Sequence, residues 1–94
     1  MTELQFKIKV LKYLKKELPG AFIYHPSDRF QSGIPDLLIL HHGIFAAIEL
    51  KIKNNQATKL QLVVLQRIGA AGGITRICWD MAGIKEVVQK IGRM

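Results

Sequence analysis

The 94-residue sequence has very little of several things, and each shortage excludes a class of protein. Its one cysteine, Cys78, excludes an internal disulfide and a cysteine-based zinc site, and fits a reducing compartment. The apolar runs are too short to span a bilayer, and the N-terminus lacks the apolar core of a signal peptide. We therefore expect a cytoplasmic protein with no membrane segment.

Acidic residues are also scarce, because seven Asp and Glu stand against 14 Lys and Arg and give a net charge of +7. This excess favours a polyanionic partner, nucleic acid first and an anionic membrane surface second. Hydrophobic residues make up 49% of the chain, which predicts a globular protein with a single domain, residues 1–94. Because a domain of this size buries only a modest core, so high an apolar fraction also favours a homodimer interface.

The apolar periodicity and the turn residues predict an α/β fold in the order helix, three strands, helix, strand, helix. Helices are expected over 3–18, 58–70 and 82–92, and strands over 21–25, about 35–41, 44–51 and 74–79. The segments between them are rich in Gly, Pro, Ser and Asn, which favour turns. The resulting architecture is a central mixed β-sheet flanked by helices.

Residues 33–51, GIPDLLILHHGIFAAIELK, contain two apolar runs separated at His42-Gly43. A hairpin turn fits there, because glycine readily adopts the positive φ that such turns need. This register places Asp36 opposite Glu49 on one face of the sheet, with Cβ atoms about 4.5–5.5 Å apart. Lys51 follows on the same face, about 7 Å further along. Three ionisable groups should therefore meet at one end of the sheet.

Two carboxylates at this separation repel by about 3 kcal/mol at an effective dielectric constant of 20. A divalent cation between them turns the repulsion into coordination, and carboxylate oxygens suit magnesium or manganese. The alternative is a register slipped by one residue, which would turn one acid to the other face and leave both solvated.

The first helix offers a third acid, Glu3. It falls between two apolar stripes, which are Leu4, Ile8, Leu11, Leu14 and Leu18 on one side and Phe6, Val10 and Tyr13 on the other. We expect its side chain to point toward the interior or an interface, where a lone carboxylate is costly. The alternative is a helix-end charge that interacts favourably with the helix dipole. The double stripe exceeds what one sheet face should cover, which again favours a dimer.

The second helix carries Gln61 on the face of Leu65 and Ile68. This position should direct its amide toward the sheet and the carboxylates, because a buried amide needs partners. The alternative is an ordinary glutamine in the first helical turn, in contact with water.

The segment Gly33-Ile34-Pro35-Asp36, followed 13 residues after the aspartate by Glu49-Leu50-Lys51, resembles the signature of the PD-(D/E)xK nucleases. With an early helical glutamate, a glutamine opening the next helix and a glycine-rich turn before the last strand, the ordered set resembles the VRR-NUC family over nearly the whole chain. The resemblance implies a restriction-endonuclease-like core. It also implies a stand-alone domain similar to the Holliday-junction resolvases, which act as homodimers.

The resemblance also implies roles for individual residues. Asp36 and Glu49 would bind Mg²⁺, for which Mn²⁺ would substitute, and the backbone carbonyl of Leu50 would add a third oxygen. Lys51 would position the attacking water or help deprotonate it, and would stabilise the charge that develops on the phosphate. Gln61 would support Lys51. Glu3 corresponds to the helix-borne acid that binds a metal directly or through water, with Glu17 as the alternative.

Basic and aromatic residues are expected to contact DNA, although a solvated surface is the alternative for each of them. The candidates are Lys9, Lys12 and Lys16 on one face of the first helix, Lys53 and Lys59 beside the acids, and Arg29 and Phe30 in the loop before Gly33. The histidines, His25, His41 and His42, lack metal-ligand spacing and are expected at turns or strand ends. Cys78 and Trp79 are expected to pack.

Together these features predict a Mg²⁺-dependent, structure-selective DNA endonuclease that acts on branched DNA such as four-way junctions. One alternative is a nucleic-acid-binding module of the same fold without turnover. The other is an RNA endonuclease of the same fold.

Overall fold

The computed structural model describes residues 1–26 and 33–92, so the predicted DNA contacts Arg29 and Phe30 lie outside the described residues. Its elements are α1 (Glu3–Glu17), β1 (Phe22–Tyr24), β2 (Leu37–His41), β3 (Ile44–Leu50), α2 (Lys59–Ala70), β4 (Ile74–Cys78) and α3 (Met81–Gly92). The predicted order is confirmed. The strand expected from residue 35 begins at Leu37, two residues later, and Pro35 in front of it has no backbone N–H to give to the sheet.

The four strands form one mixed sheet in the order β1-β2-β3-β4. The pairs β1–β2 and β2–β3 are antiparallel, and the pair β3–β4 is parallel. The hairpin turn lies at the predicted position, where His42 and Gly43 have φ values of 50° and 81°. Parallel strands need a long crossover, which α2 supplies between β3 and β4.

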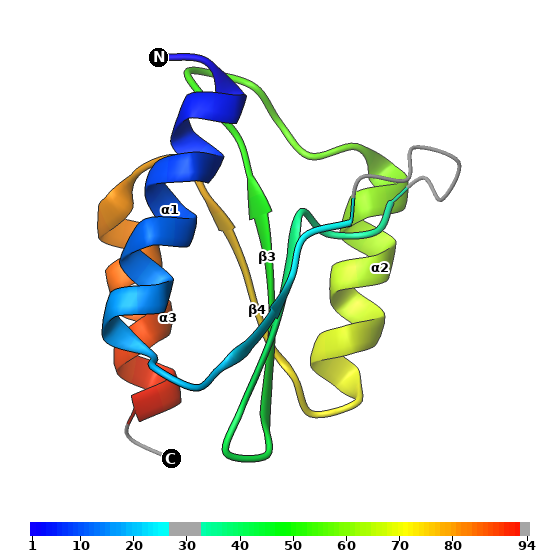
Figure 1. The fold of residues 1–94 in the computed structure, drawn as a ribbon. Coiled ribbons are helices and arrows are strands. Elements are labelled where there is room, and N and C mark those ends of the chain that lie inside the picture. The colour runs from blue at the N-terminus through cyan, green and yellow to red at the C-terminus, as the bar shows by residue number, and fades with distance from the viewer. Residues whose placement is uncertain (27–32, 93–94) are drawn as a thin grey trace.

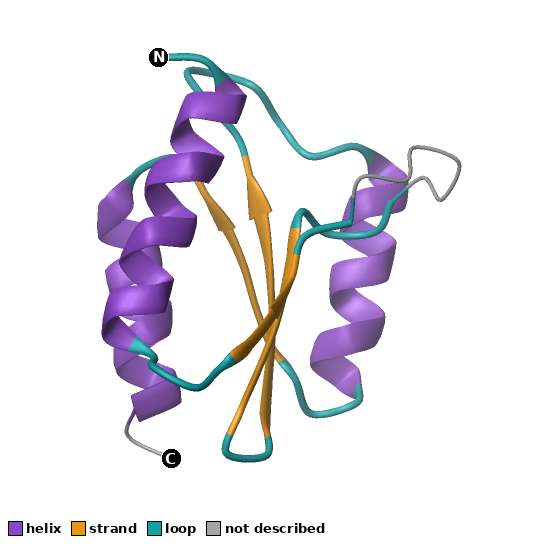
Figure 2. Ribbon diagram, in the orientation of Figure 1, coloured by secondary structure: helices purple, strands orange, loops and turns teal. Residues whose placement is uncertain are grey.

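Helices cover both faces of the sheet: α1 and α3 lie on one face and α2 on the other (Figure 1, Figure 2). The main core lies between the sheet and the α1–α3 layer. Its fully buried side chains include Val10, Leu14, Leu37, Ile39, Ile48, Leu50, Ile84, Val87 and Ile91. Burying each of these side chains contributes roughly 1.5–3 kcal/mol, so this layer holds the sheet in its register.

Helix α1 carries more apolar surface than the core covers, as its double stripe predicted. Phe6, Val10 and Leu14 are buried, but Leu4 and Ile8 of the predicted stripe are 65% and 47% exposed. The reason is that α1 shares this side of the sheet with α3, and the two helices also pack against each other. One arc of α1 therefore meets both neighbours, and the remaining apolar arc faces solvent.

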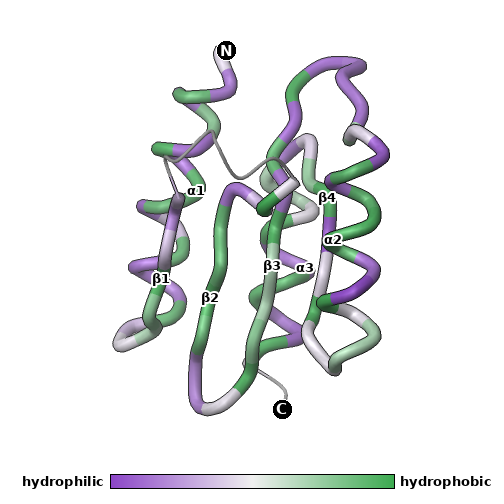
Figure 3. Tube along the Cα trace, turned by 90° about the vertical axis from the view of Figure 1, so that its right-hand side faces the viewer, coloured by the Kyte–Doolittle hydropathy of each residue, from purple (hydrophilic) through white to green (hydrophobic). Residues whose placement is uncertain are grey.

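Helix α2 covers only part of the opposite face. It packs on β4, as expected for a crossover between adjacent strands (Figure 1). Figure 3 views the molecule from this side and shows β1 and β2 with no helix in front of them. In the described part of the chain, no helix has the length and apolarity needed to cross a membrane.

Candidate active site

Asp36 comes directly before β2 and is tied to the end of β3. Its Oδ2 accepts a hydrogen bond of 2.8 Å from the backbone N–H of Leu50. Because Leu37 pairs with Ile48 in the sheet, the next positions outward bring Asp36 opposite Glu49. The predicted register is therefore present, and the slipped register, which would separate the two acids, is not.

The loop that leads into Asp36 is fixed against α2. Gly33 has a φ of 89°, a conformation that glycine adopts at little cost. A Cβ atom at this position would lie 2.7 Å from Cγ of Leu60, the second residue of α2. The glycine of the Gly-Ile-Pro-Asp segment thus lets the chain approach α2 closely, and this contact positions the aspartate.

Glu49 is the one polar or charged residue in the buried set of the described chain, and it is only 2% exposed. Burial raises its pKa most, and hydrogen bonding with Asp36 and the charge of Asp36 raise it further, to about 9. Its Oε2 is buried and has no hydrogen-bond partner among the described residues. A buried carboxylate oxygen without a partner is costly unless something else binds it.

Lys51 and Glu3 both lie close enough to act on Glu49. The positive charge of Lys51 lowers the pKa of Glu49, and the negative charge of Glu3 raises it. The backbone N–H of Lys51 donates to the carbonyl of Cys78 at 3.0 Å, which extends the β3–β4 pairing beyond Leu50. Glu3 stands half-buried in the first turn of α1. The structure therefore brings all four predicted charges, from three separate segments, to one end of the sheet.

The donor set fits a divalent cation with few protein ligands. Two facing carboxylates, one with an unpartnered buried oxygen, are hard oxygen ligands of the kind that Mg²⁺ prefers. Within residues 1–26 and 33–92, however, no three Asp, Glu, His or Cys side chains are grouped so that they could hold a metal ion. The described side chains therefore do not group Glu3 with Asp36 and Glu49 as a three-acid cluster.

Gln61 has a partner that the sequence analysis did not predict. The side-chain oxygen of Gln61 accepts a hydrogen bond from the backbone N–H of Thr58 at 2.8 Å, and the backbone N–H of Gln61 donates to Thr58 Oγ1 at 3.2 Å. These two bonds form a capping box at the start of α2. Its side-chain oxygen therefore caps α2, in line with the first-turn alternative, and among the described residues Gln61 and Lys51 form no hydrogen bond.

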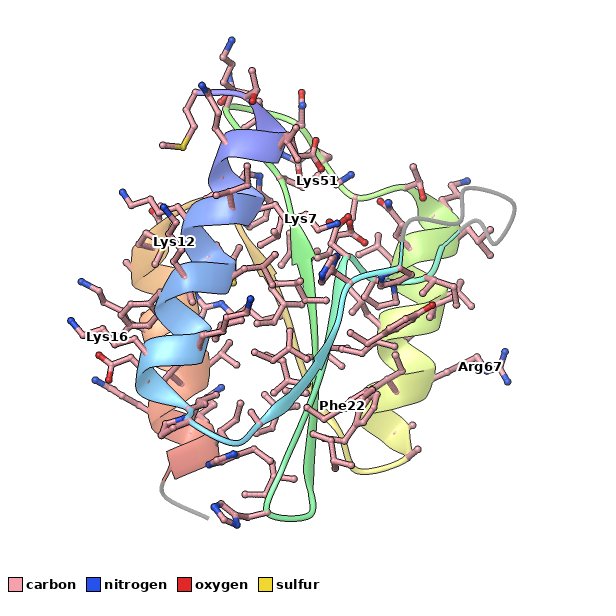
Figure 4. All side chains as sticks on the ribbon, in the orientation of Figure 1. Lys7, Lys12, Lys16, Phe22, Lys51 and Arg67 are labelled. Carbon is pink, nitrogen blue, oxygen red and sulfur yellow. The ribbon has the colours of Figure 1, made fainter. Side chains whose placement is uncertain are left out.

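The lysines expected to contact DNA differ in their placement. Lys9, Lys12, Lys16, Lys53 and Lys59 are all exposed. Figure 4 shows Lys12 and Lys16 pointing away from the sheet, on the outer side of α1. By contrast, the half-buried Lys7 lies on the side of α1 turned toward the sheet (Figure 4). Sequence reasoning missed Lys7, although it stands one helical turn after Glu3.

Trp79 ties the loop after Lys51 to the end of β4. Its indole N–H donates to the carbonyl of Asn55 at 2.8 Å, and the ring is 40% exposed. The loop is also closed by the backbone N–H of Asn55, which donates to Ile52 at 3.1 Å, and by Lys53, whose φ is 53°. Trp79 was expected only to pack, and nothing in its spacing indicated this bond.

The predictions for the remaining residues fit the described structure. His41 and His42 stack edge to face at the hairpin turn, with ring centroids 4.2 Å apart, at the end of the hairpin remote from Asp36. Cys78 is buried, and burial raises the pKa of its thiol to about 11.

No protein-family model matches this sequence, and no curated protein matches it either. A solved structure described as a "VRR_NUC domain" does match, with a TM-score of 0.68 and 24% sequence identity. The match covers 86% of this chain and 91% of that one. The similarity therefore extends over nearly the whole fold of both chains. The predicted resemblance is thus confirmed in the fold: this chain has the α/β fold of the VRR_NUC domain.

Proposed function

We propose that this protein is a Mg²⁺-dependent DNA endonuclease that hydrolyses phosphodiester bonds. The observation that carries the proposal is Glu49, a buried carboxylate with an unpartnered oxygen, which faces Asp36 and has Lys51 two residues along. A fold gains no stability from such an arrangement. It becomes favourable once a cation binds, and perturbed carboxylates of this kind are typical of functional sites. Mg²⁺, or Mn²⁺ in its place, would activate the attacking water and offset the negative charge of the phosphate.

Each side chain of the site then has a physical task. Asp36 and Glu49 hold the cation, with the backbone carbonyl of Leu50 as a further oxygen. The Leu50 N–H fixes the orientation of the Asp36 carboxylate. The backbone of Lys51 is fixed by its pairing with β4, and its ammonium group would orient water and stabilise charge on the phosphate. Glu3 adds negative charge that attracts the cation, and Gln61 keeps the start of α2 folded beside the Gly33 loop.

The substrate proposed is DNA, and in particular branched duplex DNA such as a four-way junction. The net charge of +7 favours a polyanion. The preference for branched DNA, the homodimer and a phage or mobile-element origin are proposed from the resemblance to stand-alone nucleases of this fold. A binding module without turnover is less well supported, because Asp36, Glu49 and Lys51 are all present and close together. An RNA endonuclease would use the same site.

A cleavage panel tests this proposal. The protein is incubated with linear duplex, flap, replication-fork and four-way-junction DNA, and with matched RNA, in Mg²⁺, Mn²⁺ or EDTA. We expect nicking of branched DNA that EDTA abolishes. Lys51→Ala should reduce cleavage at least 100-fold with binding within about threefold of wild type, since one positioned catalytic group contributes roughly 10²–10⁴-fold. Lys85→Ala, at an exposed position on α3, is the matched control.

The alternatives give different results in the same panel. Salt-sensitive binding without nicking in either metal would identify a non-catalytic module. Cleavage of RNA but not of matched DNA would identify an RNA endonuclease. A parallel fall of binding and cleavage in Lys51→Ala would show that Lys51 only contacts the phosphate backbone.

A further inference from the structure

The indole ring of Trp79 lies at the same end of the sheet as the candidate site. Leu50 pairs with Cys78 where β3 and β4 end, and the Lys51 N–H donates to the Cys78 carbonyl just beyond that pair. The next positions outward therefore bring Trp79 beside Lys51. Neighbouring strands are roughly 4.7–4.9 Å apart, so one strand spacing separates the two backbones.

Lys51 points to the face of the sheet that carries α2. Leu50 before it is buried in the main core, and Ile52 after it packs against the same core. Because successive side chains along an extended chain point to opposite faces, Lys51 is turned away from the core. Glu49 lies two residues before Lys51 and shares this face.

Trp79 is turned to the same face by its own neighbours. Cys78 before it is buried in the main core, and Asp80 after it accepts the backbone N–H of Gly83 in α3 at 3.2 Å. Both neighbours therefore point to the α1–α3 side. The indole N–H donates instead to Asn55, in the loop that runs from the end of β3 to α2 (Figure 1).

The ring is held in place and still open to solvent. Its hydrogen bond to the Asn55 carbonyl, at 2.8 Å, engages its only polar group, which lies at the edge of the ring. The residue is 40% exposed, which leaves about 60–100 Å² free if a whole aromatic side chain presents roughly 150–250 Å². A ring that is already fixed loses little conformational freedom when a ligand stacks on it.

The charges around the ring suit a nucleic-acid ligand. Lys51 lies beside the ring, and the exposed Lys53 lies two residues before its hydrogen-bond partner Asn55. No acidic residue occurs in residues 51–58, the segment that links β3 to α2. Proteins that bind single strands combine positive charges, which contact the phosphates, with exposed aromatic rings, on which the bases stack.

We infer that Trp79 stacks on an unpaired base of DNA, in a nucleotide next to the phosphate that Lys51 contacts. In a continuous duplex every base is paired and stacked, and taking one out costs free energy that an already unpaired base does not require. The ring therefore favours DNA with an unpaired nucleotide at the site, as branched DNA can offer. The inference gives the proposed structure selectivity a physical basis and rests on the proposed DNA substrate, but it requires no cleavage.

The first test uses the fluorescence of the ring itself. Trp79 is the only tryptophan in the chain, so the tryptophan emission reports on this ring alone. The protein is titrated in EDTA with a continuous duplex, with the same duplex carrying a short unpaired bulge, and with a bulged duplex whose unpaired nucleotides lack their bases. We expect quenching by the bulged DNA, and little change with the continuous duplex or the abasic bulge.

The second test compares affinities, measured by the fluorescence anisotropy of labelled DNA. Trp79→Leu should bind the bulged DNA at least about fivefold more weakly, as expected for the loss of one stacked base. Its affinity for the continuous duplex should stay within about twofold, because contacts to the phosphates remain. Trp79→Phe keeps a ring and should retain most of the preference. Phe22→Leu is the matched control, because Phe22 is a 66% exposed aromatic at the hairpin end of the sheet, and it should change neither affinity.

Three results would overturn the inference. The first is tryptophan emission that does not respond to bulged DNA that binds, and the second is equal quenching by the abasic bulge. The third is a Trp79→Leu variant, shown by circular dichroism to be folded, that binds bulged and continuous DNA with equally reduced affinity, which would leave the ring only its contact with the loop. Base-dependent quenching by a protein that cleaves no DNA in Mg²⁺ or Mn²⁺ would support the inference and count against the proposed chemistry alone.

Discussion

The Asp36 carboxylate accepts a hydrogen bond from the Leu50 backbone N–H at 2.8 Å, so the acid before β2 is anchored to the residue between Glu49 and Lys51. This bond joins two segments that are 14 positions apart in sequence. Because of this bond, the register of the sheet, and not a flexible loop, sets the distance between Asp36 and Glu49. The predictions below separate what such contacts do for stability from what they do for catalysis.

Asp36 should have two separable roles. Asp36→Asn keeps a side-chain oxygen that can accept the Leu50 N–H but loses the charge, so we expect cleavage to fall at least 100-fold with stability within about 1 kcal/mol of wild type. Asp36→Ala loses both, and should also cost about 1–3 kcal/mol in the free energy of unfolding. Urea denaturation and single-turnover cleavage measure the two effects. Equal destabilisation by both variants would show that the bond to Leu50 contributes nothing.

Glu49 should make stability depend on pH. Its folded pKa of about 9 lies above its ordinary value of 4.5, so between these values the folded state holds a proton that the unfolded state has lost. Its contribution is therefore fully present below about pH 4.5 and is lost as the pH rises toward 9. Glu49→Gln, which is neutral at every pH, should be the more stable protein at pH 8 and should lack this part of the decline.

Unfolding free energies measured at pH 5, 7 and 9 check this prediction, and so does their dependence on magnesium. Mg²⁺ binds the deprotonated carboxylate, so it should stabilise the wild type most at high pH and leave Glu49→Gln nearly unchanged. Parallel stability curves for the two proteins across the whole pH range would contradict the raised pKa.

Gln61 should act through the start of α2. Gln61→Ala removes half of the capping box and should cost about 1 kcal/mol of stability. Gln61→Glu should restore it, because glutamate also accepts the Thr58 N–H in this motif. Thr58→Ala is the matched control, since it breaks the same capping box from its other side. If Gln61→Ala lowers cleavage much more than Thr58→Ala at equal stability, its amide supports Lys51 after all.

Trp79 should hold the loop that follows Lys51. Trp79→Phe keeps an aromatic ring but cannot donate to the Asn55 carbonyl, so we expect a several-fold fall in cleavage, with a loss of stability of about 0.5–1.5 kcal/mol. Amide hydrogen exchange over residues 52–57 should become faster in this variant. Unchanged exchange together with reduced cleavage would assign the exposed ring to substrate contact and not to the loop.

The candidate site was predicted from sequence because a sheet has a strict period of two. Once His42-Gly43 fixed the turn, alternation alone brought Asp36 opposite Glu49 and set Lys51 beyond them, and the apolar residues between them allow only one register to bury the core. The helix order and the position of Gly33 before Asp36 followed from equally local signals. The pattern of two acidic residues and a lysine then predicted which end of the sheet carries the candidate site.

What the sequence left open was decided by how the elements pack. The apolar stripes of α1 indicated more apolar surface than the sheet could cover, but not that Leu4 and Ile8 would be the exposed part, because that depends on α3 sharing its side of the sheet. Gln61 has the same helical face in either interpretation, and the signal that it caps α2 was its spacing of three residues from Thr58. Lys7 and Trp79 were missed for a related reason. Their placement depends on how segments distant in sequence come together, which leaves no periodic trace.

The sequence by itself determined the register of the central hairpin, and with it the pairing of the two acids, because backbone alternation and one turn fix both. The tertiary structure alone decided which apolar surface remains uncovered and which polar side chains reach the acids. Those outcomes depend on how much of each sheet face the three described helices cover. A helix with the same length and the same apolar periodicity could pack on different strands, so its sequence does not fix this choice.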